Sequence, residues 1–138
     1  PQPPIHSEPL VWLGARHGTA LDKRPVPMDM AEQGCYWRTM ALKALDEADV
    51  NYRIAYTSEF CQAQIAAVRA DLAIAPLPIS VISDDLVHLG PRHGLPELGE
   101  YRMTLAKRDG FGAVEEALAT HVVAGFRKIS ERGMRLFA

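Results

Sequence analysis

Two short polar segments, EQGCYWR and TSEFCQ, each stand where a predicted strand ends and a predicted helix begins. In the first, the backbone turns at Gly34 and Cys35 opens the helix. Ligands bind at the carboxyl edge of open α/β sheets, and the free N–H groups of helix N-termini attract anions. The sequence therefore predicts a binding edge where two helix N-termini lie side by side and hold a carboxylate or another anion. The alternative is that Thr57 and Ser58 only cap a helix and Cys35 only packs.

Cys35 is also a candidate for thiol chemistry, because a thiol at a helix N-terminus can be activated as a thiolate nucleophile. No residue is spaced as its base, and its helix has no second cysteine that could resolve an oxidised thiol. Cys61, near the start of the next helix, is the other cysteine of the chain. We expect Cys35 to be structural or ligand-facing, without a disulfide to Cys61. A redox sensor or a small thiol-dependent enzyme remains the alternative.

Other reaction types lack their motifs. The five histidines never form an HxxH or HExxH pattern or a cluster with cysteine, so we expect no metal site. No GxSxG nucleophile elbow is present, and the glycines of GARHGT do not have the spacing of a phosphate-binding loop. We therefore expect a protein that is not an enzyme and that needs no cofactor.

Composition and charge set broad limits. The 138 residues are 48% hydrophobic and 23% charged, which is typical of one globular domain. A net charge of -2 supplies no basic surface for phosphates, so the chain alone should not bind DNA specifically. Two cysteines, no signal peptide and no long apolar run predict a cytoplasmic protein without membrane contact.

Hydrophobic periodicity and turn residues divide the chain into alternating elements. Prolines make the start an extended linker over residues 1–9. The strand and helix alternation after residue 26 is typical of βαβ units and a parallel sheet. The predicted strands cover residues 10–15, 26–31, 52–57, 72–77, 86–90 and 101–108, and the predicted helices cover residues 35–48, a segment capped by Ser58, and residues 112–131.

The three helices have predicted inner faces. In the first helix, Trp37, Met40 and Leu45 belong to the core, and Gly133 ends the last helix. The second helix buries Phe60, Ile65, Val68 and Leu72, and the last carries an apolar stripe of Phe111, Val114, Leu118, Val122, Phe126 and Ile129. Such a stripe needs a partner, so we expect it to repack on the chain or to pair with a second copy.

The order of several motifs resembles the C-terminal effector-binding domain of LysR-type transcription regulators. The motifs are EQGCYWR, YTS followed by an apolar AAV helix, LAIAPLP, and GLPELGEY before a final strand. The match runs from about residue 9 to residue 126. The resemblance implies an α/β, Rossmann-like fold of the periplasmic-binding-protein type (type 2), with a mainly parallel sheet flanked by helices. It assigns residues 1–9 to a hinge, 10–98 to the second subdomain and 99–138 to a return segment of the first.

The resemblance also implies a function and a site. The expected partner is a small-molecule effector, a carboxylate among the options, with self-association into a dimer and DNA contact only through a helix-turn-helix that this chain lacks. A stand-alone solute-binding protein is a third option, which the missing export signal disfavours. Peroxide-sensing members place a resolving cysteine where this chain has Ala44. By matching motif, one wall of the effector cleft comprises Gln33, Gly34, Cys35, Tyr36, Thr57, Ser58, Leu77 and Pro78.

Overall fold

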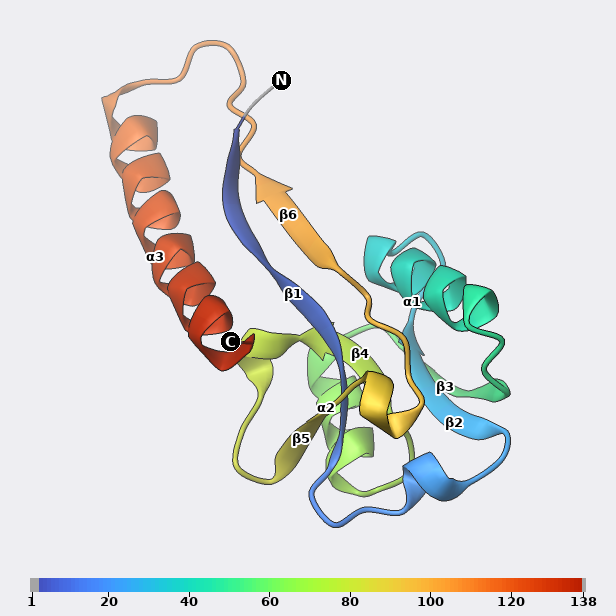
Figure 1. Ribbon diagram of the computed structural model, residues 1–138. Coiled ribbons are helices and arrows are strands. Elements are labelled where there is room, and N and C mark those ends of the chain that lie inside the picture. The colour runs from blue at the N-terminus through green and yellow to red at the C-terminus, as the bar shows by residue number, and fades with distance from the viewer. Residues whose placement is uncertain (1–2, 138) are drawn as a thin grey trace.

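The computed structural model describes residues 3–137, and the first two residues of the predicted linker and the last residue of the return segment lie outside them. The predicted strands and helices are present in the predicted order (Figure 1). The strands are β1 (Pro4–Ala15), β2 (Val26–Ala31), β3 (Tyr52–Ser58), β4 (Ala75–Pro78), β5 (Leu86–Leu89) and β6 (Glu100–Thr104). The helices are α1 (Tyr36–Glu47), α2 (Cys61–Arg69) and α3 (Ala113–Phe137). The 3-10 turns are η1 (Ala20–Asp22), η2 (Ile79–Val81) and η3 (Pro91–His93).

Strand β1 is twice as long as the predicted strand over residues 10–15, because it begins at Pro4 within the predicted linker. Its first half pairs with β6, from Pro4 opposite Thr104 to Pro9 opposite Glu100. Proline is tolerated at the first residue of a strand and along one edge, where no ladder hydrogen bond is needed from it. Local sequence predicted an extended conformation correctly, but only the distant partner β6 makes it a strand.

The pairing of β1 differs from the predicted mainly parallel sheet. Strands β2 and β3 are parallel, from Val26 opposite Tyr52 to Ala31 opposite Ser58. A parallel bridge between Met28 and Ile74 joins this pair to the segment that leads into β4. Strand β1, however, is antiparallel to β4, β5 and β6. The chain therefore has a two-stranded parallel sheet of β2 and β3 and a four-stranded antiparallel sheet built on β1, joined through this bridge. Helices α1 and α2 follow the strands of the parallel sheet.

The two shorter helices pack on opposite faces of the sheet. Successive side chains of a strand point to opposite faces, and β1 shows this directly. Trp12 belongs to a core cluster with Ala41 and Leu45 of α1, whereas Val11 and Leu13 belong to one with α2. Each helix thus covers its own face, as right-handed crossovers between parallel strands require.

Helix α2 begins later than predicted. Its first residue is Cys61 and its N-cap is Phe60, whereas Ser58 is the last residue of β3 and caps no helix. Ile65 and Val68 are buried as predicted, but the Phe60 and Leu72 side chains are 66% and 48% exposed. Both lie outside the helix, so the helical period used for the prediction does not apply to them.

Helix α3 packs on β1 with a face that includes only part of the predicted stripe, and it continues through Gly133 to Phe137. A Cβ atom at Gly133 would lie 3.1 Å from Glu8 Cβ, so the glycine allows close approach to β1 instead of ending the helix. The buried positions of α3 are Ala119 and Gly133. Of the predicted stripe, Phe111, Val122 and Phe126 are half-buried, whereas Val114, Leu118 and Ile129 are exposed.

The last segment of the chain, helix α3, lies against β1. Figure 1 shows α3 running alongside β1, on the far side from α1. The helix therefore packs within the chain, although its exposed apolar side chains leave part of its surface uncovered. Within residues 3–137, no helix combines the length and the apolar character that crossing a membrane requires.

Two leucine substitutions test the assignment of the core. Leu45 in α1 is fully buried, so Leu45→Ala should lower the free energy of unfolding by about 2–5 kcal/mol. Leu72→Ala is the matched control, because its side chain is 48% exposed and should cost less than about 0.5 kcal/mol. Urea denaturation followed by circular dichroism measures both, and equal losses would contradict the packing of α1.

Candidate functional site

The turn between β2 and α1 exposes most of its side chains. Gly34 has a φ of +91°, a left-handed conformation that glycine adopts without strain. The Cys35 N–H donates to the Glu32 carbonyl at 3.1 Å, which closes the turn. Gln33 and Gly34 are exposed, Cys35 is half-buried, and the Tyr36 side chain is 66% exposed. The segment is therefore presented to solvent at the carboxyl end of β2.

The second predicted segment begins at the end of β3, directly beside the end of β2. Strand β3 runs parallel to β2 with Thr57 opposite Met30 and Ser58 opposite Ala31. Thr57 is exposed and Ser58 is half-buried. Six of the eight predicted site residues are thus gathered at one sheet edge. The N-termini of α1 and α2 share this edge but lie on opposite faces of the sheet, so the prediction that they lie side by side is wrong.

The last two predicted site residues belong to the core. Leu77 is 0% exposed and packs in the cluster beneath α2, and Pro78 is also buried. Both pair with β1, opposite Val11 and Leu10. They lie in the strand that leads to the same edge, but they present no accessible surface there, so they can only support the site from behind.

Asp29 is a residue of this edge that the sequence prediction missed. It is 1% exposed, its carboxylate accepts a hydrogen bond from Ser58 Oγ at 2.7 Å, and its carbonyl accepts one from Gln64 Nε2 at 3.1 Å. Burial raises the pKa of Asp29, and the hydrogen bond from Ser58 opposes that rise. The signal in the sequence is one aspartate inside the otherwise apolar strand VPMDMA. Asp29 ties the ends of β2, β3 and α2 together.

The edge also borders β6 through aromatic contact. The Trp37 ring, in the first turn of α1, meets the Tyr101 ring edge-on at a centroid distance of 5.2 Å. Tyr101 is buried, and burial, followed by the negative charge of Glu8, raises the pKa of its hydroxyl far above the ordinary value. Trp37 and Met40 are only half-buried and belong to neither core cluster, so the prediction that they are core residues is wrong, whereas Leu45 is buried as predicted.

The two cysteines are present as free thiols. Burial raises the pKa of the Cys61 thiol, which disfavours the thiolate form at the only cysteine available to pair with Cys35. Among residues 3–137, no group of three or more His, Cys, Asp or Glu side chains could hold a metal ion. The exposed groups of this edge are polar side chains and backbone groups that can form hydrogen bonds.

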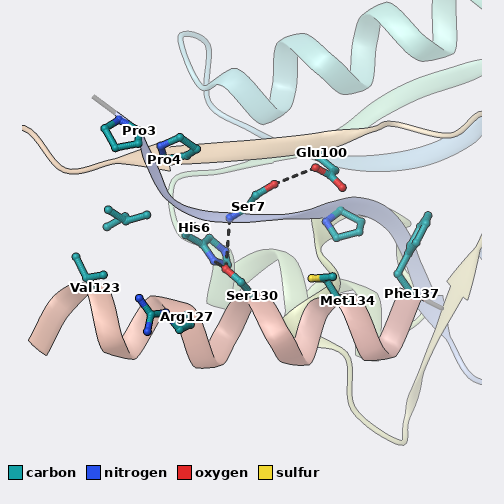
Figure 2. A pocket seen from close by; sticks show the side chains of 12 residues that line it. Pro3, Pro4, His6, Ser7, Glu100, Val123, Arg127, Ser130, Met134 and Phe137 are labelled. Carbon is teal, nitrogen blue, oxygen red and sulfur yellow. Dashed lines mark hydrogen bonds between the residues drawn. The ribbon is translucent and has the colours of Figure 1, made fainter. Parts of the chain in front are cut away.

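Two grooves lie along β1, away from the predicted edge. The larger, about 830 Å³, runs between the start of β1 and α3 (Figure 2). The smaller, about 590 Å³, lies beside the segment that joins β5 and β6. None of the eight predicted residues lines either groove. The larger one is lined by Pro3, Pro4, Ile5, His6, Ser7, Pro9, Glu100, Val123, Arg127, Ser130, Met134 and Phe137.

The chain is similar in sequence to known transcription regulators. No family model matches the chain. It is 24% identical over 128 residues to the HTH-type transcriptional regulator PecT of Dickeya dadantii, covering 86% of this chain and 40% of PecT. It is 30% identical over 101 residues to the HTH-type transcriptional regulator DgdR of Burkholderia cepacia, covering 73% of this chain and 34% of DgdR. The chain thus spans between about a third and two fifths of the length of these relatives.

Solved structures have the same arrangement of elements. Full-length HypT of Salmonella typhimurium, a hypochlorite-specific LysR-type transcriptional regulator, superposes with a TM-score of 0.64 at 15% identity, over 90% of this chain and 45% of HypT. The fold is that of a LysR-type regulatory domain. The effector-binding domain of QuiR, solved with shikimate, gives 0.61 at 15% identity over 93% of this chain and 66% of QuiR. The Synechocystis CcmR regulatory domain, solved with 2-PG, gives 0.60 at 16% identity over 91% and 66%.

These matches confirm the resemblance to LysR-type regulators and the periplasmic-binding-protein-like fold that it implied. In this LysR-type fold the six exposed or half-exposed site residues lie at the carboxyl edge of β2 and β3. PecT and DgdR are both named HTH-type transcriptional regulators.

A pair of glycine substitutions tests the backbone of the β2–α1 turn. Gly34→Ala should lower the free energy of unfolding by about 1–2 kcal/mol, because a left-handed φ is unfavourable for a residue with a Cβ although the space beside Gly34 is open. Gly125→Ala, in open space within α3, should instead raise it by about 0.5–1 kcal/mol through helix propensity. Thermal denaturation of both variants gives the signs, and two changes of the same sign would contradict the assignment.

The buried carboxyl of Asp29 predicts a pH-dependent stability. Because its pKa is raised in the folded state, the folded state binds the proton more tightly, and this contribution to stability is lost as pH rises above about 4. Asp29→Asn removes the titration and keeps an oxygen to accept from Ser58. The stability of the variant relative to wild type should therefore improve from pH 4 to pH 7 in urea titrations.

Asp71 supplies a control of opposite sign. Hydrogen bonds from the Thr19 and Ala20 N–H groups hold its pKa below the ordinary value, the bond from Thr19 being the larger cause. The stabilising contribution of Asp71 is therefore present at neutral pH and is lost as pH falls through its folded pKa. Asp71→Asn should lose stability relative to wild type as pH rises toward about 4, and the difference should then stay nearly constant over the higher range in which Asp29→Asn gains it. Parallel pH trends in the two variants would be inconsistent with these environments.

Proposed function

We propose that this chain is the effector-sensing part of a LysR-type transcription regulator, in which the ends of β2 and β3 form one wall of a small-molecule site. The observation that carries the proposal is that Gln33, Gly34, Cys35, Tyr36, Thr57 and Ser58 gather at the carboxyl edge of the sheet. This edge is the ordinary place for a ligand in an open α/β sheet. Leu77 and Pro78 support the wall from the core side.

The expected effector is a small carboxylate. Backbone N–H groups at the start of α1 and the hydroxyl of Thr57 are donors suited to carboxylate oxygens. The structure of QuiR with shikimate supports this choice, because shikimate is a carboxylate bound in the same fold. The arrangement offers hydrogen bonding without a metal or a placed nucleophile, which favours sensing over catalysis.

The division of the chain supports a larger regulatory protein. We assign residues 10–98 to the second subdomain and residues 99–138 to a return segment of a first subdomain, with residues 1–9 as the hinge. The exposed Val114, Leu118 and Ile129 side chains of α3 support this assignment, because an apolar face of that size is normally covered. DNA contact and dimer formation belong to the whole regulator, in keeping with the HTH-type names of PecT and DgdR.

Nuclear magnetic resonance titration with a panel of small carboxylates, shikimate first, tests the site. Amide shifts are expected at Gln33–Tyr36 and at Thr57–Ser58, and the methyl ester of the same compound, which lacks the charge, should shift them less. Binding should be weak, with a Kd on the order of millimolar, because one wall buries far less of a ligand than a closed pocket does. Micromolar affinity for this chain alone would refute the one-wall geometry.

The location of the shifts gives the decisive outcome. Carboxylate-dependent shifts confined to the groove between β1 and α3 would place the site elsewhere and overturn the proposal. No response to any carboxylate of the panel would overturn the expected effector class. Thr57→Val should weaken binding by removing a hydroxyl at nearly constant size, and Thr120→Val, on the exposed side of α3, is the matched control.

A further inference from the structure

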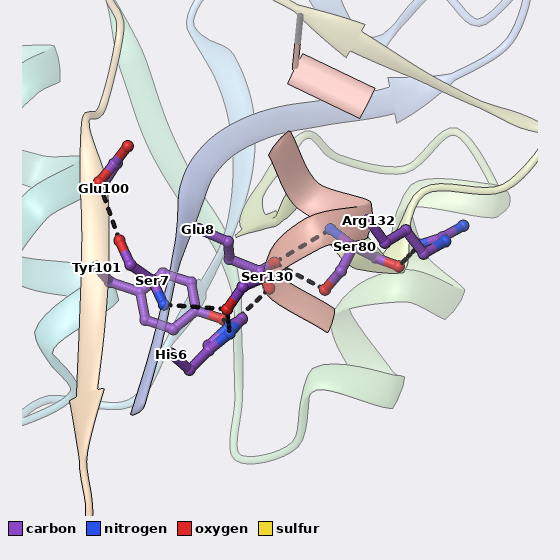
Figure 3. A network of polar contacts seen from close by, with 8 residues as sticks. All are labelled: His6, Ser7, Glu8, Ser80, Glu100, Tyr101, Ser130 and Arg132. Atoms are coloured by element: carbon purple, nitrogen blue, oxygen red, sulfur yellow. Dashed lines mark hydrogen bonds and ion pairs between the residues drawn. The ribbon is translucent and has the colours of Figure 1, made fainter. Parts of the chain in front are cut away.

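The C-terminal half of α3 is held on β1 by buried polar contacts (Figure 3). His6 Nδ1 lies 2.5 Å from Ser130 Oγ, which also accepts the Ser7 N–H at 3.4 Å. The His6 ring packs against the Phe126 ring at a centroid distance of 5.3 Å. His6 is 3% exposed, so these contacts are shielded from water. The position of α3 along β1 therefore depends on where the His6 ring sits.

A second set of contacts anchors the next turn of α3. Arg132 donates to the carbonyls of Ser80 and Ile82, in and after η2. Glu8 Oε1 accepts hydrogen bonds from the Ser80 N–H at 3.1 Å and from Ser80 Oγ at 2.7 Å, while Glu8 Oε2 lies 2.7 Å from His6 Nε2. Glu8 is 1% exposed. His6 is thus fixed from β1 as well as from α3.

On its other side, His6 contacts β6. Its Nε2 atom lies 3.3 Å from the Tyr101 hydroxyl, and the two rings meet edge-on at 5.6 Å. Tyr101 in turn meets the Trp37 ring at 5.2 Å. Trp37 is the second residue of α1 and directly follows Cys35 and Tyr36 of the candidate site. Three contiguous rings therefore connect the candidate site with α3.

We propose that Trp37, Tyr101 and His6, here called the aromatic relay, couple the first turn of α1 to the docking of α3. Protein interiors are close-packed, so a shift of Trp37 against a 7% exposed Tyr101 cannot be absorbed by empty space. The shift is passed to His6, whose polar contacts with Ser130 have a narrow range of good geometry. Tyr101 and His6 are positioning residues in this scheme, because they act through Trp37 and Ser130.

The relay deepens the proposed function by giving an effector a route to α3, and to that extent it rests on that function. An effector that moves the Gln33–Tyr36 turn would change how firmly α3 is held on β1. The coupling itself needs no ligand, because a substitution at one end of the relay must affect the other end, and coupling between two sites is reciprocal.

Hydrogen–deuterium exchange of the full chain without ligand tests the relay. Trp37→Leu should accelerate exchange in α3 residues 126–133 by at least about threefold, since local opening of that segment becomes easier. Trp37→Phe keeps an aromatic ring against Tyr101 and should restore most of the protection. Tyr36→Leu, one residue earlier with its side chain 66% exposed, should leave exchange in α3 unchanged.

Leu45→Ala separates the relay from general destabilisation. Leu45 is buried in the same helix but lies in the cluster around Trp12 and Met28, outside the relay. It should accelerate exchange across the chain without singling out residues 126–133. If Trp37→Leu gives the same uniform pattern as Leu45→Ala, or changes α1 alone, the relay is wrong.

The substitution Ser130→Ala, which should still fold, tests the coupling in the opposite direction, from α3 to α1. Ser130→Ala removes the hydroxyl facing His6 and should accelerate exchange at the first turn of α1, residues 36–40, as well as in α3. Thr120→Ala is the matched control, because the Thr120 hydroxyl donates only within its own helix, to the Glu116 carbonyl. Faster exchange in α3 alone would overturn the relay. These outcomes involve no carboxylate, so failure of the relay and failure of effector binding are distinguishable.

Discussion

The pairing of β1 is the constraint on which the rest of the structure depends. Its twelve residues pair with β6 in the first half and with β4 and β5 in the second. In the second half, alternate side chains supply both cores, Trp12 beneath α1 and Val11 with Leu13 beneath α2. In the first half, His6 and Glu8 carry the contacts to α3. One strand thus positions all three helices, because each packs against side chains or polar groups of β1.

The candidate site is a consequence of this packing. Strands β2 and β3 are held level by their parallel register and by the bridge from Met28 to Ile74, next to β1. Strand β2 is buried along its whole length, and its polar end is left at the edge beside the end of β3, where Gly34 lets the chain turn into α1. Asp29 stabilises the edge by accepting from Ser58. An exposed, hydrogen-bonding edge on a rigid base is what a sensing domain needs.

Buried polar groups hold α3 on β1. Glu8 and His6 sit in a strand whose other inward residues are apolar, and each finds a partner on another element. Such groups are costly to leave unpaired, so the elements that carry their partners have few acceptable positions. Gly133 adds a steric limit, because it lets α3 lie against Glu8. These contacts fix the position of α3 on β1 more than they add to the stability of the fold.

The sequence by itself determined the order of strands and helices, the bounds of β2, the turn at Gly34 and the family resemblance, because periodicity, turn residues and motifs are local properties. It led to a partly wrong face for α3, to a wrong face for Phe60, and to a mainly parallel sheet. Only the tertiary structure decided those features and brought Tyr101 to His6, 95 residues away. Pairing across such distances depends on register and burial, which no local pattern contains.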